Sequence, residues 1–144
     1  MFGPSVLDNS TRRSAYLRVK RSELLPFMTL FDAPEPTQSI GERIVTTVPT
    51  QALVLMNSPF VRRQSELFAD RIHPAKGGDI ESAVDRGYRA AFGRLPTPAE
   101  RTAMRSFIER QRTAPGASTP EATHLAIVEF CQGLFCLNEF VYID

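Results

Sequence analysis

Residues 79–92 have the sequence DIESAVDRGYRAAF, and this stretch decides the fold class. Its apolar residues recur at the i, i+3, i+4, i+7 spacing that gathers side chains on one face of an α-helix. They are Ile80, Ala83, Val84, Gly87, Tyr88, Ala91 and Phe92. Asp79 stands immediately before them and is a favoured N-cap residue. The pattern predicts an amphipathic helix. Because a glycine costs about 1 kcal/mol relative to alanine in an exposed helix, Gly87 on the apolar face predicts close approach by a neighbouring helix.

Two more helices are predicted on the C-terminal side of this stretch. Thr97-Pro98-Ala99-Glu100 matches a capping box, which marks a helix start. The buried stripe of that helix is expected to comprise Ala103, Met104, Phe107, Ile108 and Gln111. Thr119 and Pro120 open a final helix that is expected to reach about Leu137. Its middle is apolar on nearly every side, which predicts a helix buried all round at the centre of the fold.

Shorter signals precede residue 79. Ser58 is expected to cap a helix that starts at Pro59 and ends near residue 72. The expected face of this helix is Phe60, Val61, Gln64, Leu67, Phe68, Arg71 and Ile72. Pro49 is expected to open a short helix that reaches about Met56. Apolar residues between 22 and 31, with Pro26 near the first turn, predict another short buried helix.

These segments predict an all-α fold, a compact helical bundle of about five to six helices with an irregular, loop-rich N-terminal segment. A chain of 144 residues fits one domain, and a globule of that size buries roughly 68–70% of its unfolded surface. Residues 1–48 are expected to be a lead-in with a short helix, and residues 49–144 the bundle.

Composition limits the function classes. The formal net charge of +1 disfavours general attraction to polyanions. The local exception is a basic segment over residues 12–21, formed by Arg12, Arg13, Arg18, Lys20 and Arg21. We favour a solvated face there, with weak nucleic-acid binding as an alternative. The sequence has neither an 18-residue apolar run nor a secretion signal, so it predicts no membrane span and leaves the location open.

No motif for a metal, a cofactor or a catalytic centre stands out. The two histidines, His73 and His124, lack further ligands at a metal-binding spacing, and no cofactor is predicted. Cys131 and Cys136 are five residues apart, which places them about 140° apart around a helix. We expect both to be small buried hydrophobes rather than a disulfide or a metal site.

Polar residues threaded through the apolar run at 45–61 are the first candidate site. They are Thr46, Thr47, Thr50, Gln51 and Asn57, with Arg43 as a donor nearby. Any of them that is buried needs a hydrogen-bond partner or costs roughly 1–3 kcal/mol. We favour a polar staple that fixes the incoming loop against the bundle. The alternative is a pocket for a polar ligand such as a sugar, built from hydroxyls, amides and a guanidinium.

A second candidate follows the final helix at Asn138-Glu139-Phe140. Its polar groups can fold back onto unpaired helix carbonyls or a neighbouring arginine. Structural use of Glu139 is favoured over catalysis.

Several motifs together give the chain a family resemblance. They are residues 12–17, RRSAYL; 25–27, LPF; 30–34, LFDAP; 46–53, TTVPTQAL; 55–61, LMNSPFV; 91–97, AFGRLPT; and 137–140, LNEF. With these motifs the chain resembles the uncharacterised C-terminal domain of large planctomycete surface proteins, often linked to a cytochrome-c-like haem domain. The resemblance spans nearly the whole chain and brings no established activity with it. It implies a cell-envelope location for full-length relatives and places any haem in a separate domain.

The resemblance also frames the function. Because relatives are similar to one another well upstream of Arg12, we expect this chain to be the C-terminal part of a larger domain, with exposed apolar surface that favours self-association. The favoured function is a non-catalytic structural or interaction module of a larger envelope protein, associated with polysaccharide handling. Its expected partners are upstream domain segments, other envelope proteins or a glycan. The alternative is an enzyme fragment whose site is completed by upstream residues. Its candidate residues are Arg13, Arg43, Gln51, Asn57 and Glu139.

Overall fold

The computed structural model describes residues 26–31, 49–73, 79–113 and 120–142. Its helices are α1 Pro26–Leu30, α2 Pro49–Asn57, α3 Pro59–Ile72, α4 Ile80–Phe92, α5 Pro98–Arg112, α6 Pro120–Phe135 and α7 Asn138–Val141. These described residues contain no strand, so the all-α prediction is confirmed. The chain divides into two compact units, residues 1–54 and 55–144. The division into a lead-in and a bundle at residue 48 stays a prediction.

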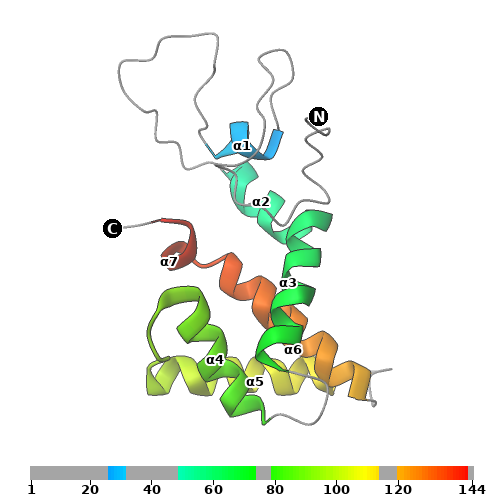
Figure 1. Ribbon diagram of the computed structural model, residues 1–144, viewed down its shortest axis with the longest axis vertical. Helices are drawn as coiled ribbons and strands as arrows, with labels where there is room; N and C mark the ends of the chain where they lie inside the picture. The colour runs from blue at the N-terminus through cyan, green and yellow to red at the C-terminus, as the bar shows by residue number, and fades with distance from the viewer. Residues whose placement is uncertain (1–25, 32–48, 74–78, 114–119, 143–144) are drawn as a thin grey trace, which may run out of the picture. The chain divides into compact units, whose positions relative to one another are not determined.

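The unit of residues 55–144 is organised around α6, which packs against α3, α4, α5 and α7. In Figure 1, α6 is orange to red and crosses α3. The fully enclosed core is shared by α3, α4, α5 and α6. It comprises Ala69, Ile72, Ala83, Val84, Tyr88, Ile108, Ala126, Ile127, Val128, Phe130, Cys131 and Leu134.

Local signals set the bounds of α4 and the start of α5, and the caps at Asp79 and Thr97 were predicted. The Asp79 carboxylate accepts a hydrogen bond from the Ser82 backbone N–H at 3.3 Å. Gly93 ends α4 in the left-handed conformation at φ 72°, which a residue without Cβ adopts at little cost. Thr97 and Glu100 form the complete capping box at the start of α5. The corner between α4 and α5 is therefore encoded locally.

The predicted cap of α3 is wrong in one respect. The Ser58 side chain makes no capping hydrogen bond, although Pro59 occupies the first turn as expected. The predicted face also needs correction, because Leu67 is 49% exposed. The buried residues of α3 are Val61, Ser65, Ala69 and Ile72. Ser65 can lie there because its hydroxyl donates to the Val61 carbonyl at 2.9 Å and is thus satisfied.

The prediction that the last long helix is buried all round is also wrong. Leu125 is 52% exposed and Gly133 is exposed, because the neighbouring helices leave one side of α6 open. The helix ends at Phe135, and the separate helix α7, which the sequence did not predict, follows. On α5, Ala103 and Gln111 are exposed rather than part of the buried stripe.

The close approach predicted at Gly87 is confirmed. A Cβ atom at this position would lie 2.9 Å from Phe130 Cε1 and 3.2 Å from Leu134 Cδ1. Both of those side chains belong to α6 and are 1% exposed, so neither can swing into solvent. The missing side chain lets α4 settle directly onto α6.

We expect Gly87→Ala to lower the free energy of unfolding by about 1–3 kcal/mol, because the added methyl group overpacks the α4–α6 contact. The matched control is Gly133→Ala, since a Cβ at Gly133 meets no atom within 4 Å. That variant should raise the free energy of unfolding by about 0.5–1 kcal/mol through helix propensity alone. Urea unfolding followed by circular dichroism measures both. Equal changes in the two variants would contradict the packing role of Gly87.

Candidate functional site

Four of the residues predicted for a site lie outside the described residues. They are Arg13, Arg43, Thr46 and Thr47. The basic segment at residues 12–21 lies outside them as well. Ligand binding by Arg13 and Arg43, a polar network at Thr46 and Thr47, and nucleic-acid binding by the basic segment therefore stay predictions.

Gln51 is the one member of the polar run that the structure shows buried and paired within the first unit. It is 6% exposed, and its Nε2 donates to the Leu30 carbonyl at 2.9 Å. This bond ties α2 to the end of α1 and satisfies an amide that would otherwise be costly to bury. Thr50 and Asn57 are exposed on α2, away from the buried position of Gln51. Because this contact of Gln51 lies within the first unit, the polar staple between the incoming loop and the bundle stays a prediction.

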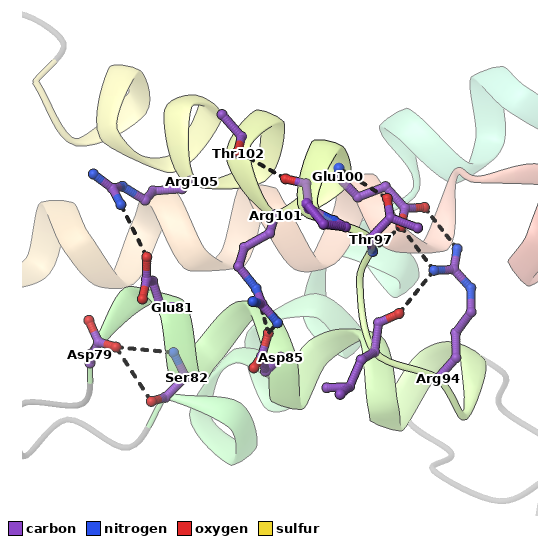
Figure 2. Close-up of polar contacts among 12 residues, drawn as sticks. Asp79, Glu81, Ser82, Asp85, Arg94, Thr97, Glu100, Arg101, Thr102 and Arg105 are labelled. Atoms are coloured by element: carbon purple, nitrogen blue, oxygen red, sulfur yellow. Dashed lines mark hydrogen bonds and ion pairs between the residues drawn. The ribbon is translucent and has the colours of Figure 1, made fainter.

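The most developed polar cluster in the described residues centres on Arg94. We call Arg94, Glu100 and Glu139 the Arg94 clasp. Arg94 directly follows the α4 cap, Glu100 lies in the first turn of α5, and Glu139 lies in α7. Figure 2 shows the guanidinium directed at the Glu100 carboxylate. The clasp thus joins three elements, one of them distant in sequence.

Every N–H group of the Arg94 guanidinium has an acceptor. Nη1 donates to Glu100 Oε2 at 2.9 Å and to the Leu95 carbonyl at 3.1 Å. Nη2 donates to Glu100 Oε1 at 2.8 Å and to Glu139 Oε2 at 2.6 Å. Nε donates to Glu139 Oε1 at 2.7 Å. Since a guanidinium has five N–H donors, these five bonds leave it none for a ligand.

Aromatic rings support the guanidinium. Its Cζ lies 5.4 Å from the centroid of the Tyr88 ring and 5.8 Å from that of Phe92. The two rings contact each other edge to face at 5.3 Å. Burial raises the pKa of Tyr88, and the nearby Glu100 carboxylate raises it further. Cation–π attraction therefore adds to the ion pairs that hold Arg94 at this corner.

The clasp keeps both of its carboxylates charged. Hydrogen bonds from the Arg94 guanidinium, and then from the Thr97 backbone, lower the pKa of Glu100 to about 2. The pKa of Glu139 is also lowered, chiefly by hydrogen bonds from Arg94. A general acid or base works best with a pKa near the operating pH, so this arrangement is poorly suited to proton transfer near neutrality.

A second cluster links α6 to α3 and to the carboxyl end of α2. Gln132 Nε2 donates to the Met56 carbonyl at 2.7 Å and to the Leu55 carbonyl at 3.3 Å. Arg62 Nη1 reaches Glu129 Oε1 at 2.5 Å and Gln132 Oε1 at 3.3 Å. Helix ends carry unpaired carbonyls, so Gln132 acts as a distant cap for α2.

Ion pairs also run between α4 and α5. Asp85 pairs with Arg101 at 2.8 Å, and Glu81 pairs with Arg105 at 3.1 Å (Figure 2). All four side chains are more than a third exposed, so each pair contributes little to stability.

Metal and thiol chemistry find little support in the part of the chain that the structure describes. No group of three or more His, Cys, Asp or Glu residues there could hold a metal ion. Cys131 and Cys136 are free, and burial raises the pKa of Cys131 to about 12. Its thiol is therefore protonated and shielded, as expected of a small buried hydrophobe. None of the described helices combines the length and apolarity that a membrane crossing needs.

Sequence reasoning gave a neighbouring arginine as one of two possible partners for the polar groups at 138–140, the other being unpaired helix carbonyls, and did not single out Arg94 or Gln132. Arg94 had a usable signal, since it lies between a helix stop at Gly93 and a capping box at Thr97. Gln132 had a weaker signal, a lone amide in a mainly apolar helix that needs a partner wherever it is covered.

One comparison with known proteins gives a match. A family model described as PSD1, a protein of unknown function (DUF1553), matches residues 4–108. No curated protein matches the chain. No solved structure matches it.

We expect stability to fall as the pH drops from about 4.5 toward 2. The pKa of Glu100 is about 2 in the folded chain against 4.5 as the ordinary value, so its stabilising effect is present above 4.5 and is lost through protonation below it. Glu100→Gln should lower the melting temperature at neutral pH and flatten this acid dependence. Glutamine at this position can still complete the capping box, so the variant isolates the charge.

The matched control is Glu66→Gln, an exposed carboxylate that lies 3.7 Å from Arg62 within α3. Thermal unfolding across the acid range measures all three proteins. A pH profile of Glu100→Gln that parallels those of the wild type and the control would contradict the role of the clasp.

Proposed function

The chain belongs to the PSD1 (DUF1553) family of unknown function, and on that premise we propose that it is a non-catalytic structural or interaction module of a larger cell-envelope protein. Its partners are upstream domain segments or other envelope proteins, and polysaccharide handling is the process we propose for the larger protein. The proposed envelope location and the proposed role in polysaccharide handling both depend on the family resemblance. The motifs that carry this resemblance include residues 46–53, 91–97 and 137–140.

The saturation of Arg94 is the observation that carries the non-catalytic part of the proposal. Its five N–H groups are all engaged by its own chain, in four bonds to carboxylates and one to a carbonyl. A catalytic or anion-binding arginine needs donors directed at an open position. The clasp instead uses its charge to fix the corner between α4 and α5 and to hold α7.

Exposed apolar side chains on α2 support the interaction part. Leu53 is 57% exposed and Met56 is 61% exposed, and their i, i+3 spacing puts them on one side of the helix. The nine residues of α2 include no charged side chain. A short helix that is apolar on several sides is typical of one that is covered in a larger assembly.

The enzyme alternative draws on Gln51, Asn57 and Glu139 among the described residues. Gln51 bonds to the Leu30 carbonyl and Glu139 to Arg94, both of them groups of this same chain, and Asn57 is exposed at the end of α2. These contacts favour the structural interpretation.

Self-association tests the proposal. We expect the wild-type chain to show a weight-average mass that rises with concentration in light scattering, and to bind a hydrophobic dye. Replacing both Leu53 and Met56 with glutamine should abolish the rise and reduce dye binding several-fold. Because exposed substitutions usually change stability by less than about 0.5 kcal/mol, the variant should stay folded, which circular dichroism verifies.

The matched control is Leu125→Gln, which removes one exposed leucine from α6. It should associate like the wild type. A wild-type chain that stays a monodisperse monomer without dye binding would count against the interaction module.

A further inference from the structure

The junction between α6 and α7 lacks the local signals that end other helices of this unit. Only Cys136 and Leu137 separate Phe135, the last residue of α6, from Asn138, the first of α7. Leu137 occupies the N-cap position of α7 and provides no side-chain hydrogen bond. The corner between α4 and α5, by contrast, has a left-handed glycine and a complete capping box. The local sequence therefore does not account for the break.

Tertiary contacts hold α7 in place. A helix of four residues is far too short to be stable alone. Glu139 bonds to Arg94 through both carboxylate oxygens, at 2.7 and 2.6 Å. Phe140 contacts the ring of Phe135 at 4.9 Å but remains 43% exposed. The apolar contact is thus only half closed. The ion pair is as exposed as those between α4 and α5, but it is bidentate, and this is the geometry in which an exposed pair still contributes to stability.

The bundle does not depend on α7. No residue of α7 belongs to the enclosed core shared by α3 to α6. Arg94 remains fixed without Glu139, because Glu100 and the Leu95 carbonyl still accept three of its N–H groups. Removal of α7 therefore leaves both the core and the Arg94 corner assembled.

We propose that α7 is a latch, closed by the Glu139–Arg94 ion pair and able to open while the helical bundle stays folded. Opening uncovers the ring of Phe135 that Phe140 contacts, and it leaves Nε and one N–H of Nη2 on Arg94 without their acceptor. The exposed seat has the chemistry that fits a carboxylate followed by an aromatic side chain. This inference goes beyond the proposed function and does not depend on it.

Amide hydrogen exchange of the full chain, followed by NMR, tests the latch. The reporter amides are those of Phe140, Val141 and Tyr142, which donate to the carbonyls of Leu137 and Asn138. We expect Glu139→Gln to speed their exchange by at least about tenfold, while amides within α4 and α5 keep their wild-type rates. The control Glu81→Gln removes an ion pair between α4 and α5 and should leave the reporter amides unchanged.

The salt dependence of exchange distinguishes attachment of α7 by the ion pair from attachment by apolar packing alone. Exchange of the reporter amides should rise with sodium chloride concentration in the wild type and stay flat in Glu139→Gln, because screening weakens only a pair that exists. Equal reporter rates in the wild type and Glu139→Gln would overturn the proposal. An equal acceleration of reporter and core amides in Glu139→Gln would overturn it too, since α7 would then open only with the whole bundle.

Discussion

The close contact between α4 and α6 is the constraint on which the rest of the second unit depends. Gly87 places backbone where a methyl group would collide with Phe130 and Leu134. Protein interiors are close-packed, so this approach fixes how deeply α4 lies on α6. The fully buried Tyr88 and Val84 flank Gly87 on α4, and their packing depends on the same separation. The position of α4 in turn decides where Gly93 and Arg94 emerge.

The position of α4 in the core also decides where the Arg94 clasp forms at the surface. Glu100 comes to Arg94 because the capping box fixes the first turn of α5, while Glu139 reaches it from 45 positions away in the sequence. Residues 91–97 and 137–140, which the family resemblance singled out separately, therefore meet in one ion cluster. In this cluster each motif supplies charge that the other needs.

Features set by neighbours in sequence could be predicted, and features set by distant partners could not. The caps at Asp79 and Thr97 and the tight contact at Gly87 follow from local chemistry and helical spacing. The face of α3 could not be foreseen in detail, because the small residues Ser65 and Ala69 are buried there while Leu67 points outward. Apolar periodicity alone ranks leucine above serine and misses a hydroxyl that bonds within its own helix.

The end of α6 is a second feature that the local sequence did not predict. The sequence predicts a helix to about Leu137, because residues 134–137 contain no glycine, proline or capping side chain that would stop it. The helix nevertheless ends at Phe135. The contact that holds the short helix after the break is remote in sequence: Glu139 bonds to Arg94, which Glu100 holds as well. A break that depends on a surface ion pair is weaker than one encoded by a left-handed glycine, so this junction can change its conformation at a lower cost than the corner between α4 and α5.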